Sequence, residues 1–341
     1  MAPVTSSEAA RVLSEIAYLL RLEEKDAYRA RAFGAAAASL LQARPDVAAL
    51  RSAGALESIE GVGPGIARVL TELVDTGTSG YLARLRTDMG ATGTESGISL
   101  QGYRGDIHAH STWSDGKATI LEMARGAVAR GYEYMAITDH SPRMTIVNGL
   151  NGARLAEQRR EIDLVQELVP EITILQGIEV DILEDGSLDL PDDVMAGLDI
   201  VVASPHLKLR MEPHLMTPRM MRAVENPHVD VIGHPTGRRP GSRPGAVYDY
   251  EKVFRRAAET GVALEIDCDP ARMDLSPEMA RMAVDAGCML AMDSDAHAPG
   301  EYVYVELGAW MAGRAGLQPE NILNWMPLPE LRRHLGARGG G

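Results

Sequence analysis

The sequence predicts an α/β barrel of parallel strands that follows a small all-α domain. After residue 100, short apolar runs alternate with longer amphipathic segments, which is the pattern of repeated strand-helix units. Six of the seven expected strands deliver a histidine or a carboxylate at their carboxyl ends, where α/β barrels build their active sites. Before residue 88 the apolar side chains recur at helical spacing instead.

Composition places the chain among ordinary globular proteins. Its 341 residues, 45% hydrophobic and 24% charged, suffice for two domains or for one barrel with an appendage. The formal net charge of −14 argues against a broad nucleic-acid-binding surface. No apolar run is long enough to span a membrane and residues 1–14 lack a signal-sequence pattern, so we expect a cytoplasmic protein. Cys268 and Cys288 are expected to be reduced and buried.

The first 88 residues are expected to form helices. Residues 7–42 predict two helices, with Ser7 and Asp26 as their N-terminal caps. A third helical segment, residues 47–60, runs into the sequence Gly-Val-Gly-Pro-Gly, and a helical face resumes at Ile66. We therefore expect a bundle of short helices around a glycine-rich turn.

Helix, glycine-rich hairpin and helix is the layout of a helix-hairpin-helix element. The backbone amides of such a hairpin, here at Gly61, Gly63 and Gly65, can hold a nucleic-acid phosphate together with the start of the next helix. The alternative is an ordinary turn between helices, because the glycine spacing alone is a weak motif. We interpret the segment as a DNA-binding element that positions a phosphate without reading sequence.

The chain is therefore expected to have three parts. Residues 1–88 form the helical domain, residues 89–102, rich in Gly, Thr and Ser, form a linker, and residues 103–341 form the barrel. The seven expected strands are 103–107, 134–137, 173–178, 200–203, 229–232, 263–266 and 289–292. Helices are expected near 118–130, 153–168, 215–226, 251–260 and 276–286.

Candidate metal ligands gather at the ends of the expected strands. His108 and His110 are two residues apart on a strand and therefore point to the same side. A single pair of this kind is more often a chance pairing, but six of the nine histidines lie at such strand ends. The nine candidate ligands are His108, His110, Asp115, His140, Glu179, His206, His234, Asp295 and His297.

Nine ligands are too many for one ion, which at a catalytic site usually keeps about three protein ligands and a water. Two or three clustered divalent ions are therefore expected, with Glu179 as the bridging carboxylate. Clustered cations suit phosphoester hydrolysis, because they bind phosphate oxygens and lower the pKa of a water molecule. Zinc, manganese and iron all accept these nitrogen and oxygen ligands.

These motifs resemble a known family. His-x-His with a following Asp, Thr-Asp-His-Ser, Gly-Ile-Glu-Val-Asp, Ala-Ser-x-His, Gly-His-Pro-Thr-Gly-Arg and Ser-Asp-Ala-His occur in the order seen in the polymerase and histidinol phosphatase (PHP) domain. Residues 103–335 resemble most closely the PHP domain of bacterial family X DNA polymerases, and residues 8–88 resemble the N-terminal domain of those enzymes. The resemblance implies a distorted seven-stranded TIM-like barrel with three bound ions.

The resemblance also implies an allocation of ligands and roles. The first ion would be held by His108, His110, Glu179 and Asp295, the second by Glu179, His206 and His234, and the third by Asp115, His140 and His297. The catalytic centre would consist of Glu179, Asp295 and His206.

Two activities of related enzymes are expected to be absent. Only the linker separates the two matching regions, so the fingers, palm and thumb of a polymerase have no place between them. Some related N-terminal domains remove a sugar phosphate through a Schiff-base lysine in the helix after the hairpin. This chain has Arg68 and Val69 there, and no lysine occurs between Lys25 and Lys117.

The preferred hypothesis is a metal-dependent phosphoesterase that acts on DNA ends, as a 3′-5′ exonuclease or a 3′-end-processing phosphatase. The alternatives are a small-molecule phosphomonoesterase of the histidinol-phosphatase type and a non-catalytic DNA-binding adaptor. We expect that the protein does not associate with a membrane and does not require a protein partner.

Several loop residues are candidates for binding the substrate phosphate. Each could instead be an ordinary solvated loop side chain. Asp139 is expected to orient a ligand imidazole, and Asp267 and Asp269 follow the one strand without a ligand. The candidate substrate-binding residues are Arg143, Asn148, Lys208 and Arg238, with Arg239 as an alternative to Arg238.

Overall fold

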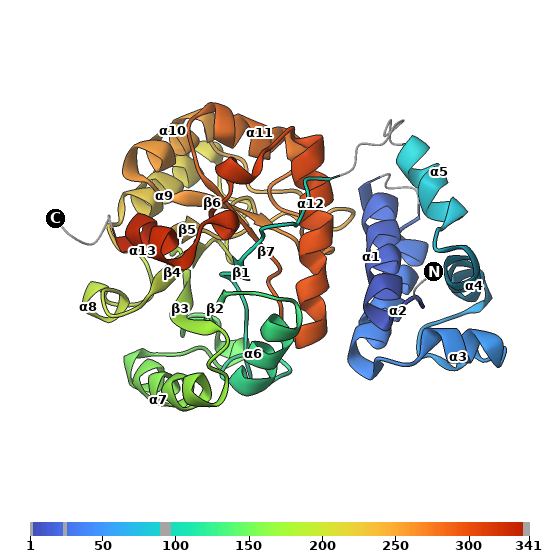
Figure 1. The fold of residues 1–341 in the computed structure, drawn as a ribbon. Coiled ribbons are helices and arrows are strands. Elements are labelled where there is room, and N and C mark those ends of the chain that lie inside the picture. Colours follow the sequence, from blue (N-terminus) through green and yellow to red (C-terminus); the bar gives the residue numbers. More distant parts are fainter. Residues whose placement is uncertain (1–2, 23–25, 89–96, 337–341) are drawn as a thin grey trace. The chain divides into compact units, whose positions relative to one another are not determined.

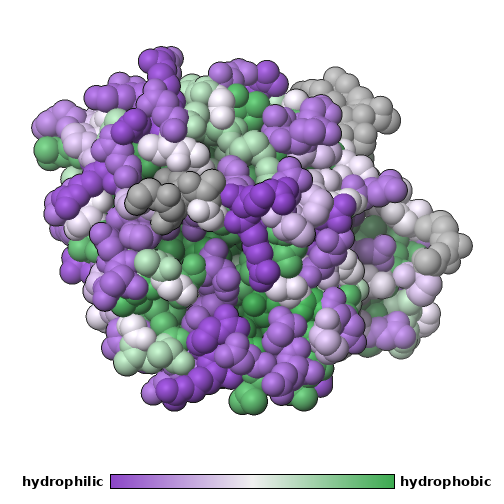
Figure 2. Space-filling view, turned by 60° about the vertical axis from the view of Figure 1, so that its left-hand side comes forward, coloured by the Kyte–Doolittle hydropathy of each residue, from purple (hydrophilic) through white to green (hydrophobic). Residues whose placement is uncertain are grey.

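The structure is a computed structural model that describes residues 3–22, 26–88 and 97–336. The chain forms two compact units, one comprising Met1–Ser96 with Arg239–Arg243 and one comprising Gly97–Arg238 and Pro244–Gly341 (Figure 1). Part of the expected linker, residues 89–96, lies outside the described residues. On the face seen in Figure 2 hydrophilic residues predominate, with smaller hydrophobic areas between them. Among the described residues no helix combines the length and the apolar character needed to cross a bilayer.

The N-terminal unit is helical, as predicted. Thr5, and not Ser7, caps its first helix, because the Thr5 hydroxyl accepts from the Glu8 amide while the Glu8 carboxylate accepts from the Thr5 amide. The predicted cap Asp26 is confirmed, since its carboxylate accepts from the Arg29 amide at 2.9 Å. Within residues 3–22 and 26–88 its α-helices are α1 Ser6–Leu22, α2 Ala27–Ala43, α3 Val47–Ser52, α4 Pro64–Thr76 and α5 Gly80–Asp88.

The expected helical segment 47–60 is interrupted. α3 ends at Ser52, Gly54 takes a left-handed backbone conformation with φ of 64°, and a single 3₁₀ turn follows over Leu56–Ser58. The hairpin glycines then lead into α4, with Gly63 as its N-cap and Pro64 at its first position. The helix, hairpin and helix order predicted from the glycines is therefore present.

A partly buried ion pair joins the first and last helices of this unit. Arg86 on α5 donates through Nε and Nη2 to the two carboxylate oxygens of Glu15 on α1, at 2.6 and 2.8 Å. The Glu15 side chain is 1% exposed. Its desolvation is compensated by the two-point guanidinium contact, so this pair fixes how α5 packs on α1.

The second unit confirms the predicted α/β barrel. Seven parallel strands are hydrogen-bonded in sequence order, and helices surround them (Figure 1). The apolar runs identified in the sequence become buried strands because both faces of a parallel sheet are covered. The strands are β1 Gly105–Asp106, β2 Tyr134–Ile137, β3 Thr173–Asp181, β4 Ile200–Ser204, β5 Val231–Ile232, β6 Ala263–Asp267 and β7 Leu290–Asp293.

The five helices expected between the strands are all present. Three further helices were not recognised from the sequence: α8 Asp192–Met195, α12 Val305–Arg314 and α13 Leu328–Gly336. α12 buries most of its residues, so its apolar pattern lacks a clear helical period. The predicted helices are α6 Ile120–Ala129, α7 Gly152–Leu168, α9 Pro213–Glu225, α10 Tyr250–Thr260 and α11 Pro277–Asp285.

The first and last strands meet at a seam closed largely by side chains. One parallel bridge, between Ala109 and Ala296, joins the segments that follow β1 and β7. Asp106 accepts from the Ser294 amide at 3.0 Å, and Asp293 accepts from the Ile107 amide at 2.8 Å. These two buried carboxylates thus take the place of a regular backbone ladder, which accounts for the distortion of the barrel.

Asn324, which is fully buried, forms hydrogen bonds to both β1 and β7. Its Oδ1 accepts from the Met292 amide at 2.7 Å, and its Nδ2 donates to the Gly105 carbonyl at 2.9 Å and to Asp293 Oδ1 at 2.7 Å. Removing this amide would leave several buried polar groups without a partner.

We therefore expect Asn324→Ala to lower the free energy of unfolding of the barrel by about 3 kcal/mol. Denaturant and thermal unfolding of the full chain, followed by circular dichroism, measure the change. Glu330→Ala, at an exposed position of α13, is the control and should unfold as the wild type does. Equal stability of the two variants would contradict the role assigned to Asn324.

Candidate metal centre

All nine candidate ligands come together at the carboxyl end of the barrel. Glu179 lies within β3, and the other eight lie in the segments that follow β1, β2, β4, β5 and β7. Parallel strands bring these segments to one mouth, which is why residues separated by almost two hundred positions become neighbours. Three groups of them have ligand atoms within 4.8 Å of one another. These groups are His110, Asp115, His140 and His297; His108, His110 and Asp295; and His140, Glu179 and His206.

Glu179 occupies the centre of the cluster and is 1% exposed. Its Oε1 lies 2.8 Å from His234 Nε2 and 3.1 Å from His206 Nε2. Its Oε2 lies 2.8 Å from His140 Nδ1 and 3.6 Å from His110 Nε2. Each oxygen therefore faces a different set of imidazoles, which is the geometry that a bridging carboxylate requires.

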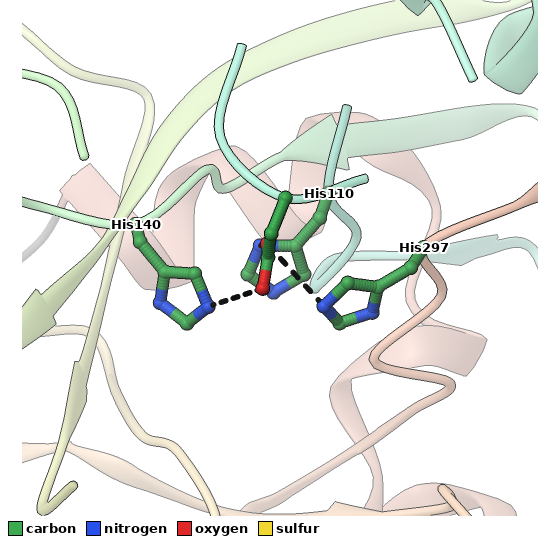
Figure 3. A group of neighbouring side chains, drawn as sticks. His110, His140 and His297 are labelled. Carbon is green, nitrogen blue, oxygen red and sulfur yellow. Dashed lines mark ion pairs between the residues drawn. The ribbon is translucent and has the colours of Figure 1, made fainter. Parts of the chain in front are cut away.

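A second carboxylate, Asp115, groups with three imidazoles at the outer edge of the cluster. Figure 3 shows these imidazoles, His110, His140 and His297, gathered around one space. The oxygens of Asp115 are 3.6 Å from His140 Nε2, 3.5 Å from His297 Nε2 and 3.7 Å from His110 Nδ1. The Asp115 side chain is 30% exposed, so this part of the centre is the most accessible to solvent.

Asp295 approaches from the end of β7 and meets the two histidines that follow β1. Its Oδ1 lies 3.0 Å from His110 Nε2 and 3.8 Å from His108 Nε2. Asp295 and His234 both have positive φ, 50° and 26°, which is unfavourable for residues other than glycine. The backbone is thus strained at Asp295 and His234, whose side chains point toward the metal-ligand cluster at the carboxyl end of the barrel.

The ligand imidazoles are oriented by residues that the sequence analysis missed. Glu265 Oε1 contacts His108 Nδ1 at 2.6 Å, and Asp181 Oδ1 contacts His206 Nδ1 at 3.0 Å. Such contacts fix which ring nitrogen faces an ion. Glu265 interrupts an otherwise apolar strand, and a charged residue there must find a buried partner. This charged residue within an apolar run is the sequence feature from which the role of Glu265 could have been predicted.

The expectation for Asp139 is wrong. Its carboxylate accepts from the amides of Ser111 and Ser114 and from Gln158 Nε2, and none of these contacts involves an imidazole. Asp139 therefore holds the loop between His110 and Asp115 in place.

Arg272 is a buried cation beside the cluster that no sequence pattern indicated. Its Nε lies 3.4 Å from Asp267 Oδ2 and 3.4 Å from Asp295 Oδ2, and its side chain is 11% exposed. Asp269 accepts from the Ala271 amide at 2.9 Å and so shapes the loop that presents Arg272. One oxygen of Asp295 thus faces the guanidinium while the other faces the histidines.

The electrostatics of the centre follow from burial and from mutual proximity. Burial and the neighbouring His297 and His140 lower the pKa of His110 to about 3, so its ring is neutral. Burial also acts to lower the pKa of His140, but the carboxylates of Glu179 and Asp115 raise it to about 10. A group of carboxylates this dense attracts positive charge, whether as protons or as cations.

The donor set fits divalent cations. Among the nine candidate ligands, five imidazoles have a buried ring nitrogen that makes no hydrogen bond of acceptable geometry, and neutral imidazole nitrogen is the atom that a metal ion binds. A buried polar atom without a partner is costly and calls for a missing partner. The five residues are His108, His110, His140, His206 and His234.

The candidate substrate-binding residues are placed in different ways. Arg143 is exposed and lies 3.4 Å from Glu184, and Asn148 Nδ2 lies 3.5 Å from the Trp113 carbonyl. Lys208 is an exposed loop residue with φ of 56°. Arg238 donates through Nε to the Met273 carbonyl at 2.8 Å, so its guanidinium is tied to the loop after β6.

A parallel barrel with a cluster of imidazoles and carboxylates at its mouth defines a metal-dependent hydrolase of the α/β barrel class. The PHP domain family matches residues 106–266, and a helix-hairpin-helix domain family matches residues 5–79. Together with the relatives described next, these matches show that the chain belongs to the PHP family. The prediction of a metal-dependent phosphoesterase is thereby confirmed.

Two curated relatives illustrate the similarity. The DNA polymerase/3'-5' exonuclease PolX of Bacillus subtilis (strain 168) is 41% identical over 238 residues, which are 70% of this chain but only 42% of that protein. A "Probable phosphatase" of Thermoanaerobacter sp. (strain X514) is 34% identical over 232 residues, 64% of this chain and 89% of that protein. This chain thus spans less than half of the first relative and most of the second.

One solved structure shows a more distant likeness. It is a histidinol phosphate phosphatase from Lactococcus lactis, 18% identical, with a TM-score of 0.47 over 63% of this chain and 95% of that chain. The likeness is too low to inform the site.

Glu265 provides a test of how the imidazoles are oriented. Glu265→Gln replaces one of two accepting oxygens with a donor, so the residue can no longer accept from both His108 Nδ1 and the His234 amide. We expect the affinity for a divalent metal to fall about 10- to 100-fold. Competition with a chromophoric chelator measures this affinity. Glu278→Gln, at an exposed position of α11, is the control, and unchanged affinity in Glu265→Gln would contradict the assignment.

Proposed function

We propose that this phosphoesterase acts on DNA ends, as a 3′-5′ exonuclease or a 3′-end-processing phosphatase. The observation that supports it most is the gathering of nine ligand-type side chains, Glu179 among them, at one end of the barrel, in a chain that also contains a helix-hairpin-helix unit. The identity to a protein named as a 3'-5' exonuclease extends over 70% of the chain. Polymerisation is not part of the proposal.

We further propose that the nine residues hold two or three divalent ions. His108, His110, Glu179 and Asp295 would hold the first, Glu179, His206 and His234 the second, and Asp115, His140 and His297 the third. Bound there, the ions would bind phosphate oxygens and lower the pKa of a water molecule. The residues themselves set the arrangement: Glu179 and Asp295 supply buried negative charge, and His206 is oriented by Asp181.

The helix-hairpin-helix unit supplies the proposed grip on DNA. Gly61 has φ of 78°, a conformation that only glycine adopts readily. A side chain added at Gly63 or Gly65 would meet no atom within 4 Å, so the backbone is open on that side. Together with the start of α4, these open amides offer a place for a phosphate group.

The second candidate function is a small-molecule phosphomonoesterase. The net charge of −14 and the high coverage of the "Probable phosphatase" relative favour it. The two functions share one metal centre and differ in whether the helical unit contributes to substrate binding.

Glu179 tests the shared centre. Because Glu179→Gln removes the central charge and one potential bridging oxygen, we expect the metal content to fall and hydrolysis of p-nitrophenyl phosphate to drop more than about 100-fold. Elemental analysis and steady-state kinetics measure both. Chelation of the wild type should also abolish turnover, and added Mn²⁺ or Zn²⁺ should restore it. Full activity of the chelated protein would contradict a metal-dependent reaction.

The helical unit tests the choice of substrate. We expect the double variant Gly63→Glu and Gly65→Glu to fold, since both positions have space, and to repel a phosphate backbone. Processing of a labelled oligonucleotide with Mn²⁺ should fall about tenfold or more, whereas turnover of p-nitrophenyl phosphate should not change. The neutral pair Gly63→Ser and Gly65→Ala is the matched control. Equal loss of both activities, or no processing of oligonucleotide by the wild type, would favour the small-molecule function.

A further inference from the structure

An open pocket of about 680 Å³ lies between two loops of the barrel unit. One loop follows β2 and contributes residues just after His140, and the other follows β3 and contributes residues just after Asp181. The volume is within the usual range for small-molecule sites. The lining residues are Pro142, Arg143, Thr145, Leu183, Leu188, Asp189, Leu190 and Pro191.

Asp189 fixes the two loops against each other. Its Oδ1 accepts from Ser141 Oγ at 2.6 Å and from the Asp181 amide at 3.0 Å, and its Oδ2 accepts from the Arg143 amide at 2.7 Å. Both carboxylate oxygens are therefore engaged by the walls. The pocket is formed in advance, because its shape does not depend on a ligand to bring the loops together.

The same loops reach the metal centre. Pro142 is two residues from His140, so their Cα atoms lie within about 7 Å of each other. The Ser141 amide donates to the Glu179 carbonyl at 2.9 Å, and Asp181, which donates its amide to Asp189, contacts His206. A phosphoester whose phosphate lies at the centre would therefore have its organic group within reach of this pocket.

The mostly apolar side chains that line the pocket favour an apolar organic group of the substrate over a polar one. Proline and leucine side chains form most of the wall, and hydroxyl groups placed against them would lose hydrogen bonds to water without replacement. A flat ring of low polarity would instead bury its faces against these residues. Arg143, at the rim beside Glu184, has a planar guanidinium that can stack on such a ring.

We propose that this pocket binds the base of the nucleotide whose phosphate is hydrolysed. The proposal rests on the proposed function and adds the terminal nucleobase, rather than the sugar or the helical unit, as a determinant of affinity at the barrel. In this arrangement the loops after β2 and β3 bind the base of the substrate, and the centre formed by the nine candidate ligands binds its phosphate.

The test compares two probes on the full chain loaded with Mn²⁺. Inorganic phosphate reports on the metal centre alone, whereas a non-hydrolysable nucleotide, the 3′-phosphonomethyl analogue of thymidine 3′-monophosphate, also offers a base. We expect the wild type to bind the nucleotide about tenfold more tightly than phosphate, as measured by isothermal titration calorimetry. In the double variant Leu183→Gln and Leu188→Gln, neutral amides replace two apolar walls, so the two dissociation constants should become similar while that of phosphate stays the same.

Leu168→Gln, at a position of α7 that is 66% exposed and outside the pocket, is the matched control and should behave as the wild type does. Preference for the nucleotide that survives in the double variant, or no preference in the wild type, would overturn the pocket assignment. A preference that is lost as expected, in a protein that leaves oligonucleotides intact, would keep the pocket assignment and overturn the action on DNA. Absence of phosphate and nucleotide binding would overturn both.

Discussion

The barrel unit is organised around one buried carboxylate. Glu179 is almost fully removed from water, and five imidazoles lie within 3.7 Å of its two oxygens. An isolated negative charge in such a position would cost several kcal/mol, so the surrounding groups must supply compensating positive charge. The long strand β3 carries this residue, and the loops after four other strands, β1, β2, β4 and β5, bring the five imidazoles to it.

The surroundings of the cluster add more acids than bases. Glu265, Asp267 and Asp295 are buried near its edge, and Arg272 is the guanidinium that lies closest to two of them. Burial raises the pKa of Glu265 and Asp267, whereas the neighbouring imidazoles keep the pKa of Asp295 low despite its burial. Asp295, whose Oδ1 faces His110 and His108, is therefore held in its ionised form, which is the form of a carboxylate that a cation requires.

Much of this arrangement was predictable because it depends on residue type at strand ends. The seven strands appear as apolar runs, and histidines are rare enough that six of them at strand ends is informative. The orientation of the rings was not predictable, since Glu265 and Asp181 each contact a ring that a different strand presents, and the sequence does not specify which side chains meet. No sequence pattern indicated Arg272, because the geometry of the loop after β6 is what turns it toward Asp295. The Asp139 prediction failed because two nearby serines offered its carboxylate closer donors than any imidazole.

The seam between β1 and β7 has a consequence for the stability of the whole barrel. His108 and His110 lie on one side of it and Asp295 and His297 on the other, and in the part of the chain that the structure describes the two sides are joined by the Ala109–Ala296 bridge, by the backbone hydrogen bond from Lys117 to His297 and by side-chain contacts. Cations bound by residues from both sides would link the segments that follow β1 and β7, and so hold the first and last strands of the sheet together. Metal binding and folding of the barrel would then be thermodynamically linked. The free energy of unfolding would rise with the concentration of free metal ion.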